Sequence, residues 1–392
     1  MKCPYLWTMN SVETSKLELG ILGGGQLGKM LIEAASDWNI RCHVLDPDPQ
    51  ASCSKLAHTF VNGSFADYDT VYQFGKNLDR LTIEIEHVNV AALHQLEKEG
   101  KQIFPQPAVL EIIQDKGKQK AFYEYNDLPT SNYQYVDSKE ALIELLEEEK
   151  LSYPFVQKTC KAGYDGKGVA VIKSKDDIVS LLDGPCIIED VVDIEKELSV
   201  IVARNRNGNT SCFPTVEMEF HPVANLVEFL LAPANISEAQ EETAKQIAID
   251  CINAFGMTGI LAVEMFLTRN GEILINEVAP RPHNSGHHTI EANDVSQYQQ
   301  LLRCLFDLPL GSTKAWQHAI MVNLLGEPGY SGLAKYEGLS DCLSLEGVHV
   351  HLYGKQITKP YRKMGHVTII GDNIQAMREK ASFVRERLRI IA

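Results

Sequence analysis

The sequence predicts an α/β protein of two or three domains, the first of them a doubly wound parallel sheet. Strand and helix patterns alternate from about residue 17 to residue 114, which is typical of a parallel sheet covered by helices. At 392 residues the chain is too long for one ordinary core. A strong hairpin signal, Asn270-Gly271 between two apolar runs, indicates a further domain with antiparallel strands.

Composition excludes several classes of partner. The net charge of −15 and the pI near 5.3 argue against nucleic acid or an anionic membrane surface. The nine cysteines are scattered without a Cys-x-x-Cys pair, so we expect neither a disulfide framework nor a zinc ribbon. No apolar run is long enough to span a membrane, and residues 1–16 lack the apolar core of a signal peptide. We therefore expect a cytoplasmic protein that acts on small molecules.

A glycine-rich segment separates the first predicted strand from the first predicted helix. Gly23, Gly25 and Gly28 satisfy the G-x-G-x-x-G pattern, and Asp46 ends the next strand. The pattern is compatible with dinucleotide binding. A lone motif of this kind is weak, and we favour the alternative, in which the glycines allow a tight strand-to-helix turn and close packing, with room for the phosphate of a different ligand at the helix start.

The first domain continues the alternation. We predict strands over 17–22, 41–45, 59–61 and 80–85 and helices over 29–35, 68–78 and 90–99. The last of these strands delivers Glu84 and Glu86 to the carboxyl edge of the sheet, where ligands of such folds bind.

The next segment contains a glycine-rich loop between two predicted strands. Gly163, Gly166 and Gly168 lie in this loop, with Lys158 and Lys167 beside them. Backbone amides and lysines in such a loop can bind phosphates, although a flexible hairpin tip has the same composition. Helices over 116–126 and 141–150 precede the loop, and strands over 185–189 and 197–203 follow it. These strands carry Glu189 and Glu197, which could accept hydrogen bonds from a nucleobase amine or from ribose hydroxyls.

The hairpin predicts a metal site. If Asn270 and Gly271 are the two central turn residues, Glu264 lies directly opposite Glu277 on one face of the ladder. Facing carboxylates in apolar strands are costly unless something compensates them. A hard divalent cation, which takes oxygen ligands, would compensate both. In the alternative register, both carboxylates face solvent.

The C-terminal part carries an unusual basic cluster. We predict helices over 238–255 and 297–306 and strands over 320–324 and 347–353. Beyond them, Lys355, Lys359, Arg362 and Lys363 lie close together in an otherwise acidic chain. Such a cluster indicates either an anionic substrate group or a solvated loop.

Taken in order, these motifs resemble the ATP-grasp superfamily. They are most similar to the N5-carboxyaminoimidazole ribonucleotide synthetases, which are ATP-dependent carboxylases of purine biosynthesis. The resemblance extends from about residue 17 to residue 387, and the Asn-Glu-x-Ala-Pro-Arg-x-His-Asn-Ser-Gly-His string is its most specific part. The matching segments are Gly-Gly-Gly-Gln-Leu-Gly-Lys-Met (23–30), Glu-Ile-Glu-His-Val (84–88), Lys158 to Gly168, Glu189 with Glu197, 276–287, and Lys355 with 362–366.

The resemblance implies three domains after a tail at residues 1–16. They are a Rossmann-like pre-ATP-grasp domain over 17–115, a lid over 116–205, and a C-terminal ATP-grasp domain over 206–392 that ends in a small β subdomain. ATP would lie between the lid and the C-terminal domain.

The resemblance also implies a role for each matching residue. ATP would be bound by Lys116, Lys158, Gly163, Gly166, Lys167, Gly168, Glu189, Val192, Glu197, His221, Asn276 and Glu277. Magnesium or manganese would bind Glu264 and Glu277, joined by Asn276 only if the strand bulges there. The ribonucleotide would contact Glu86, Tyr164, Asp165, Lys167, Arg281, His283 and Asn284, and its phosphate Lys355, Arg362 and Lys363.

The implied reaction joins bicarbonate to the amine of 5-aminoimidazole ribonucleotide, with ATP converted to ADP and phosphate through carboxyphosphate. Asp165 or Glu86 would hold the substrate amine, and a homodimer is expected. The nearest alternative is another ATP-grasp ligase, such as a formate-dependent glycinamide ribonucleotide transformylase. A nicotinamide-dependent oxidoreductase using the first glycine motif and a non-catalytic nucleotide sensor are the alternatives from other classes.

Overall fold

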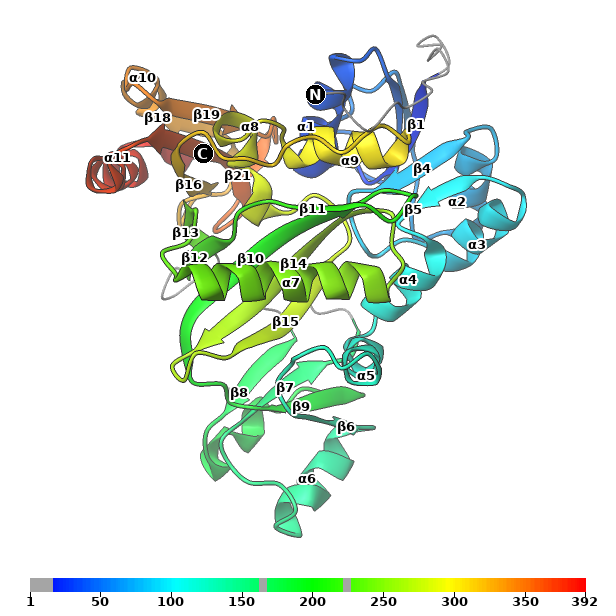
Figure 1. The fold of residues 1–392 in the computed structure, drawn as a ribbon, viewed down its shortest axis with the longest axis vertical. Helices are drawn as coiled ribbons and strands as arrows, with labels where there is room; N and C mark the ends of the chain where they lie inside the picture. The colour runs from blue at the N-terminus through cyan, green and yellow to red at the C-terminus, as the bar shows by residue number, and fades with distance from the viewer. Residues whose placement is uncertain (1–16, 162–167, 221–226) are drawn as a thin grey trace, which may run out of the picture.

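The computed structural model describes residues 17–161, 168–220 and 227–392. Its fold has three parts arranged around one long sheet (Figure 1). In that view the lid lies below the central strands, and the N-terminal and C-terminal parts lie side by side above them.

The N-terminal part is a five-stranded parallel sheet with strand order β3-β2-β1-β4-β5, as the alternating pattern predicts. Its inner strands β1, β2 and β4 are largely buried, as in a parallel sheet covered on both faces, whereas the edge strand β3 is mostly exposed. The strands are β1 (Glu18–Leu22), β2 (Arg41–Asp46), β3 (Thr59–Asn62), β4 (Arg80–Ile83) and β5 (Gln102–Phe104). The helices are α1 (Gln26–Ser36), α2 (Tyr68–Gly75), α3 (Val90–Lys98) and α4 (Pro107–Ile113).

Two of the boundaries that differ from the predicted ones lie at the first glycine loop. Helix α1 begins at Gln26, three residues before the predicted start, because Gly28 belongs to its first turn. A Cβ at Gly28 would lie 3.0 Å from the Cys53 sulfur, so glycine permits this close packing. Strand β4 ends at Ile83, two residues early, because Glu84 turns toward the glycine loop and accepts a hydrogen bond from Gly25 N.

The lid contains a four-stranded antiparallel sheet with order β6-β9-β7-β8. It has its own core, which includes Leu142, Phe155 and Ile188. Its strands are β6 (Tyr133–Val136), β7 (Phe155–Thr159), β8 (Val169–Ile172) and β9 (Cys186–Asp190). Its helices are α5 (Lys116–Tyr125), α6 (Lys139–Glu147) and a 3₁₀ segment (Lys175–Ser180).

The long sheet joins the ATP-grasp and C-terminal regions in the order β15-β14-β10-β12-β13-β16-β21-β19, with β11 paired to β10. Its strands are β10 (Ile194–Arg204), β11 (Thr210–Cys212), β12 (Val216–Phe220), β13 (Val227–Ala232), β14 (Gly259–Thr268), β15 (Ile273–Ala279), β16 (His318–Leu325), β19 (Val348–Leu352) and β21 (Lys363–Gly371). Two short pairs complete the strands, β17 (Gly332–Leu333) with β20 (Ile357–Thr358) and β18 (Lys335–Glu337) with β22 (Arg389–Ile391). The helices are α7 (Glu238–Ala254), α8 (Thr289–Ala292), α9 (Gln297–Leu305), α10 (Leu339–Leu343) and α11 (Ile374–Arg387), with a 3₁₀ turn at Asn284–Gly286. No helix within the described ranges is both long and apolar enough to cross a membrane.

The β14–β15 hairpin has a three-residue loop, so the predicted two-residue turn is wrong. Thr268 pairs with Glu272, and Gly271 occupies the left-handed region with φ +88°. This geometry is that of a type I turn followed by a glycine bulge. It displaces the register next to the turn by one residue from the predicted one.

A second irregularity restores the predicted register. The ladder shifts between Met265 and Glu264, where Asn276 is the extra residue on β15. Ile275 and Val278 both pack against α7, so Asn276 and Glu277 both lie off the core face. Glu264 therefore pairs with Glu277 as predicted, and the bulge that Asn276 requires is present.

Candidate active site

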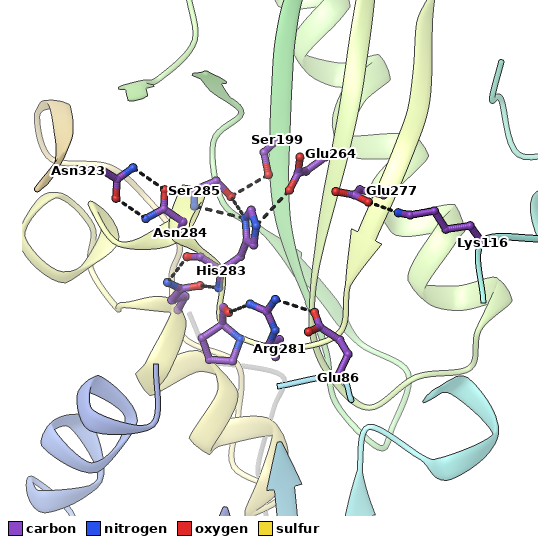
Figure 2. A network of polar contacts seen from close by, with 12 residues as sticks. Glu86, Lys116, Ser199, Glu264, Glu277, Arg281, His283, Asn284, Ser285 and Asn323 are labelled. Carbon is purple, nitrogen blue, oxygen red and sulfur yellow. Dashed lines mark hydrogen bonds and ion pairs between the residues drawn. The ribbon is translucent and has the colours of Figure 1, made fainter. Parts of the chain in front are cut away.

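Two facing carboxylates mark the centre of the candidate active site (Figure 2). Glu264 and Glu277 are cross-strand partners on the face of the hairpin opposite α7. His283 Nε2 lies 3.1 Å from Glu264 Oε1, and Lys116 Nζ lies 2.5 Å from Glu277 Oε2. Two carboxylates that face each other on a ladder are unfavourable unless each has a polar partner. Here Lys116 is the partner of Glu277, and His283 is the partner of Glu264.

Lys116 is the first residue of α5, and its side chain connects the lid to the Glu264–Glu277 pair. Its backbone N–H donates to Cys160 O, 2.8 Å away, which ties the start of α5 to the end of β7. The Lys116 ammonium holds the pKa of Glu277 at about 2, well below the usual range of a carboxyl group. Glu277 is therefore ionised at neutral pH and available to a cation.

A second ion-pair group lies beside the first. Lys158 Nζ donates to Asn276 Oδ1 at 2.7 Å and lies 2.7 Å from Glu189 Oε2. Lys120 Nζ lies 2.6 Å from the other oxygen of Glu189, whose side chain is only 4% exposed. Both Glu189 oxygens are thus paired with lysines, and the predicted hydrogen bond from a nucleobase amine to this carboxylate stays a prediction.

Glu197 lies on β10, next to β14. Burial, together with the nearby negative charges of Glu264 and Glu277, raises its pKa to about 7, against the opposing effect of Lys158. A cation bound to Glu264 and Glu277 would therefore favour the ionised form of Glu197.

The segment after β15 joins the hairpin to the N-terminal sheet. Arg281 Nη2 lies 2.7 Å from Glu86 Oε1, at the carboxyl edge of that sheet (Figure 2). His283 follows, and its Nδ1 lies 2.9 Å from the Ser285 hydroxyl, which lies 2.8 Å from Ser199 Oγ. These contacts place Glu86, Arg281 and His283 along one side of the carboxylate pair.

Asn284 is held from the C-terminal region. Its amide exchanges two hydrogen bonds with Asn323 of β16, at 2.8 and 3.0 Å. Asn323 also donates to Val227 O at 2.7 Å. The position of Asn284 is therefore fixed by the long sheet.

The first glycine loop is already filled by carboxylates. Gly24 N donates to Asp46 Oδ2 at 2.7 Å, and Gly25 N donates to Glu84 Oε2 at 3.2 Å. A side chain at Gly25 would collide with the carboxylate of Glu84. Because carboxylates occupy these amides and would repel a pyrophosphate, the dinucleotide interpretation of this motif is wrong and the tight-turn interpretation holds.

The basic cluster is ordered by backbone carbonyls. Lys355 Nζ donates to Lys363 O at 2.8 Å and lies 5.6 Å from the centre of the Tyr353 ring. Arg362 Nη1 donates to Ile357 O at 2.6 Å. The cluster begins directly after β19, a neighbour of the strand that bears Lys363.

An open cleft lies between the lid and the β14–β15 hairpin. It measures about 690 Å³, and its lining includes Ser131, Val192, Thr268 and Leu274. Val192 belongs to the segment predicted to hold adenine. The cleft thus offers a mixed polar and apolar surface between the lid and the hairpin.

Several predicted ligands lie outside the described residues, namely Gly163, Tyr164, Asp165, Gly166, Lys167 and His221. Gly168, at the end of this loop, has φ +76° and its carbonyl accepts from Thr159 N at 2.9 Å.

Two buried polar residues contribute to the site without having been predicted. Lys120 holds Glu189, and Gln297 of α9 both accepts from His283 N and donates to His283 O, each at 2.8 Å. A Cβ at Gly286 would lie 2.5 Å from Gln297 Oε1, which explains the glycine there. Their signal in the sequence is weak, because a lysine or glutamine on an amphipathic helix is usually exposed.

The residues present fit a magnesium ion that also binds a nucleotide. Within the described part of the chain, no three His, Cys, Asp or Glu side chains form a metal-binding group by themselves. Mg²⁺ usually binds one or two carboxylates and completes its shell with water and substrate phosphates. Glu264, Glu277 and the Asn276 amide supply such an oxygen set, and Lys116 now provides the positive charge beside it.

Three family models cover most of the chain. Residues 17–114 match the ribonucleotide synthetase preATP-grasp domain, residues 121–298 the ATP-grasp domain, and residues 319–380 the phosphoribosylaminoimidazole carboxylase C-terminal domain.

Curated relatives agree with these matches. The chain is 37% identical over 94% of its length to a chloroplastic phosphoribosylaminoimidazole carboxylase of Vigna aconitifolia, and it spans just under two-thirds (66%) of that protein. It is 36% identical to N5-carboxyaminoimidazole ribonucleotide synthase of Bacillus subtilis, over 90% of this chain and 91% of that one.

Solved structures agree as well. The N5-carboxyaminoimidazole ribonucleotide synthetase of Thermotoga maritima superposes with a TM-score of 0.87 and 41% identity, over 96% of this chain and 99% of that one. The Aspergillus clavatus synthase in complex with ADP and 5-aminoimidazole ribonucleotide gives a TM-score of 0.85 at 32% identity, over 95% and 98% of the two chains. From its motifs, its fold and these relatives, the chain belongs to the N5-carboxyaminoimidazole ribonucleotide synthetase family of ATP-grasp proteins.

Proposed function

We propose that this protein carboxylates 5-aminoimidazole ribonucleotide, using ATP and bicarbonate and releasing ADP and phosphate. The observation that carries the proposal is the convergence of Glu264, Glu277, Lys116 and Lys158 beside the loop that bears Arg281. The two carboxylates could bind a metal ion that also contacts phosphates, and the two lysines could bind the phosphates directly. The loop faces the edge of the N-terminal sheet at which Glu86 lies.

In this proposal ATP occupies the cleft between the lid and the hairpin. Lys116 and Lys158 would move from their present carboxylate and amide partners to the phosphates, which are stronger acceptors for ammonium groups. The segment from Glu189 to Val192 would line adenine, and Glu197 would accept from the ribose hydroxyls. Gly163, Gly166, Lys167 and Gly168 would close over the phosphates, and His221 would lie nearby.

Glu264, Glu277 and Asn276 would hold Mg²⁺ or Mn²⁺. When bound, the ion would neutralise charge that develops on the phosphoryl oxygens during transfer. Lys116 and Lys158 would share this task from the lid side.

Bicarbonate needs activation because hydroxide is a poor leaving group. Its oxygen would attack the γ-phosphoryl group, and the carboxyphosphate so formed would pass its carboxyl group to the substrate amine, releasing phosphate. Carboxyphosphate hydrolyses readily, so the lid must exclude water while this intermediate exists.

The ribonucleotide would lie between the N-terminal sheet and the basic cluster. Glu86, Tyr164, Asp165, Arg281, His283 and Asn284 would contact its ring and ribose, and Lys355, Arg362 and Lys363 its phosphate. Glu86 and Asp165 are the candidates to hold the amine. If Asp165→Asn kept full turnover, Asp165 would not have this role.

The decisive experiment measures ADP release with Mg²⁺ and bicarbonate, in the presence and absence of 5-aminoimidazole ribonucleotide. We expect strict dependence on the ribonucleotide, incorporation of labelled bicarbonate into an acid-labile product, and a loss of at least about 100-fold in Glu277→Gln. Glu242→Gln, an exposed change on the far side of α7, is the matched control and should keep full activity. Release stimulated by formate and another ribonucleotide would favour the transformylase instead.

We also infer from the resemblance that the protein forms a homodimer and acts in the cytoplasm.

A further inference from the structure

Lys120 is a buried cation that neither the family pattern nor the proposed reaction uses. Its side chain is 2% exposed, although lysine is rarely buried without a specific partner. Its Nζ contacts Glu189 Oε1 at 2.6 Å, Thr130 Oγ1 at 2.6 Å and Ser131 Oγ at 2.9 Å. It therefore lies behind the ATP cleft and not in it.

Glu189 connects Lys120 to Lys158, which contacts Asn276 beside the carboxylate pair. One carboxylate oxygen of Glu189 meets Lys120 and the other meets Lys158, at 2.7 Å. The Glu189 side chain is 4% exposed, so water screens these charges poorly. Lys120, Glu189 and Lys158 thus form a buried row in which two ammonium groups share one carboxylate.

The charge balance of this row determines how strongly Lys158 is held. A single carboxylate that pairs with a single buried lysine forms a closed, neutral pair. A carboxylate shared by two lysines leaves one net positive charge. Of the two, Lys158 is the lysine beside the Glu264–Glu277 pair, because its other partner is Asn276. Lys120 thereby leaves Lys158 free to attract an anion.

The same lysine fixes the geometry of the hinge. Thr130 Oγ1, which contacts Lys120, donates to Ile275 O at 2.7 Å, and Ile275 N donates to Pro129 O at 2.8 Å. Ile275 directly precedes the bulge residue Asn276. Lys120 therefore links α5 and β9 of the lid to the strand that carries the metal ligands.

We propose that Lys120 is a positioning residue for ATP: it neutralises Glu189 from behind, so that Lys158 keeps its positive charge for the phosphates. This inference rests on the proposed function only as far as nucleotide binding, because Lys120 acts through Glu189 and Lys158 and touches no substrate.

The test is a double-mutant cycle read out as the Kd of Mg²⁺–ADP by calorimetry, with no ribonucleotide present. Lys120→Met should weaken ADP binding by roughly tenfold or more, because Glu189 then pairs with Lys158 alone. Adding Glu189→Gln should restore affinity to within about threefold of the Glu189→Gln single variant, since the competing charge is gone. Lys118→Met, at an exposed position on the same helix, is the control and should change the Kd less than about twofold.

Each outcome decides the proposal. An unchanged Kd in Lys120→Met, or a loss that Glu189→Gln does not reverse, overturns it, because a merely structural lysine would not be rescued by removing a charge. If Lys120→Met does not fold, the Kd of Mg²⁺–ADP is compared between Glu189→Gln and the double variant. A tenfold difference between these two Kd values contradicts the proposal. In the steady state the KM for ATP should rise while the KM for the ribonucleotide stays the same.

The cycle also separates this inference from the proposed function. A wild-type protein that binds ADP but shows no ribonucleotide-dependent ADP release would refute the carboxylase assignment alone. In that case the calorimetric cycle would still test Lys120.

Discussion

Burial and the two neighbouring carboxylates Glu264 and Glu277 both raise the pKa of Glu197. The pKa of Glu197 is raised to about 7, while that of Glu277 is held at about 2 by Lys116. Two carboxyl groups on adjacent parts of one sheet thus have opposite protonation preferences, because only one of them has a close cation. Perturbed pKa values of this kind cluster at functional sites.

The raised pKa of Glu197 predicts how stability depends on pH in the metal-free protein. Its folded-state value, about 7, exceeds the unfolded value of about 4.3, so the folded state binds this proton more tightly. The favourable contribution is complete below about pH 4.3 and is lost as the pH rises through 7. In EDTA, the melting temperature of Glu197→Gln should therefore fall less between pH 5 and pH 8 than that of the wild type. Glu195→Gln, an exposed neighbour on the same strand, should follow the wild type, and parallel curves for all three proteins would disprove the assignment.

At the scale of elements, the β14–β15 hairpin shows what the sequence could and could not predict. The apolar runs and the Asn-Gly pair correctly predicted the two strands and the pairing of Glu264 with Glu277. The predicted turn was one residue too short, which displaces the register near the turn by one residue. The bulge at Asn276 shifts the register back, so that Glu264 still pairs with Glu277. The signal for the bulge is present in the sequence, because the core positions Ile273, Ile275 and Val278 break the period of two that a regular strand requires.

The three-residue loop gives a prediction for Gly271. Gly271 has φ +88°, and a Cβ at this position would meet no atom within 4 Å. A side chain would therefore be disfavoured only by the strain of the left-handed backbone conformation. Gly271→Ala should lower the free energy of unfolding by about 1 kcal/mol, measured by urea denaturation. Gly271→Asn should lose less, because asparagine tolerates the left-handed region better. Equal losses, or none, would mean that the loop has another conformation in solution.

Other site contacts could not be predicted from local sequence. The carbonyl and amide of His283 are held by Gln297, and Glu189 is held by Lys120, through packing between separate elements. The sequence patterns of α5 and α9 do not distinguish the buried Lys120 and Gln297 from solvent-exposed side chains. The filled glycine loop is a similar case, because Glu84 and Asp46 come from strands on either side of β1 and only the folded sheet brings them together.

At the scale of the molecule, the N-terminal part and the long sheet share one core. Leu27 and Met30 of α1 pack in the same cluster as Ile201 of β10 and Tyr298 and Leu301 of α9. The lid has a separate cluster around Leu142 and Phe155. The predicted boundary at residue 115 therefore separates two sheets but not two hydrophobic cores. Because β10 belongs to the long sheet, the predicted lid range of 116–205 extends too far, and we propose that the sheet β6–β9 with its own core is the part that moves.

This arrangement predicts unequal local stability. Amides of β6, β7 and β9 in the lid should exchange hydrogen faster than those of β10 and β14, because their smaller core can open alone. Adding Mg²⁺–ADP should slow exchange in the lid and leave β1 and β2 nearly unchanged. Uniform exchange across the three parts, measured by mass spectrometry, would show that the lid does not open independently.

The bulge on β15 has a consequence for how this strand can change. Without Asn276, the remaining residues alternate regularly, with Ile275 and Val278 inward and Glu277 outward and still facing Glu264. Asn276 is thus equivalent to a one-residue insertion that adds an amide side chain beside the carboxylate pair, while the core contacts and the pair stay in place. At this position the chain can gain or lose a functional group without exchanging a single buried side chain.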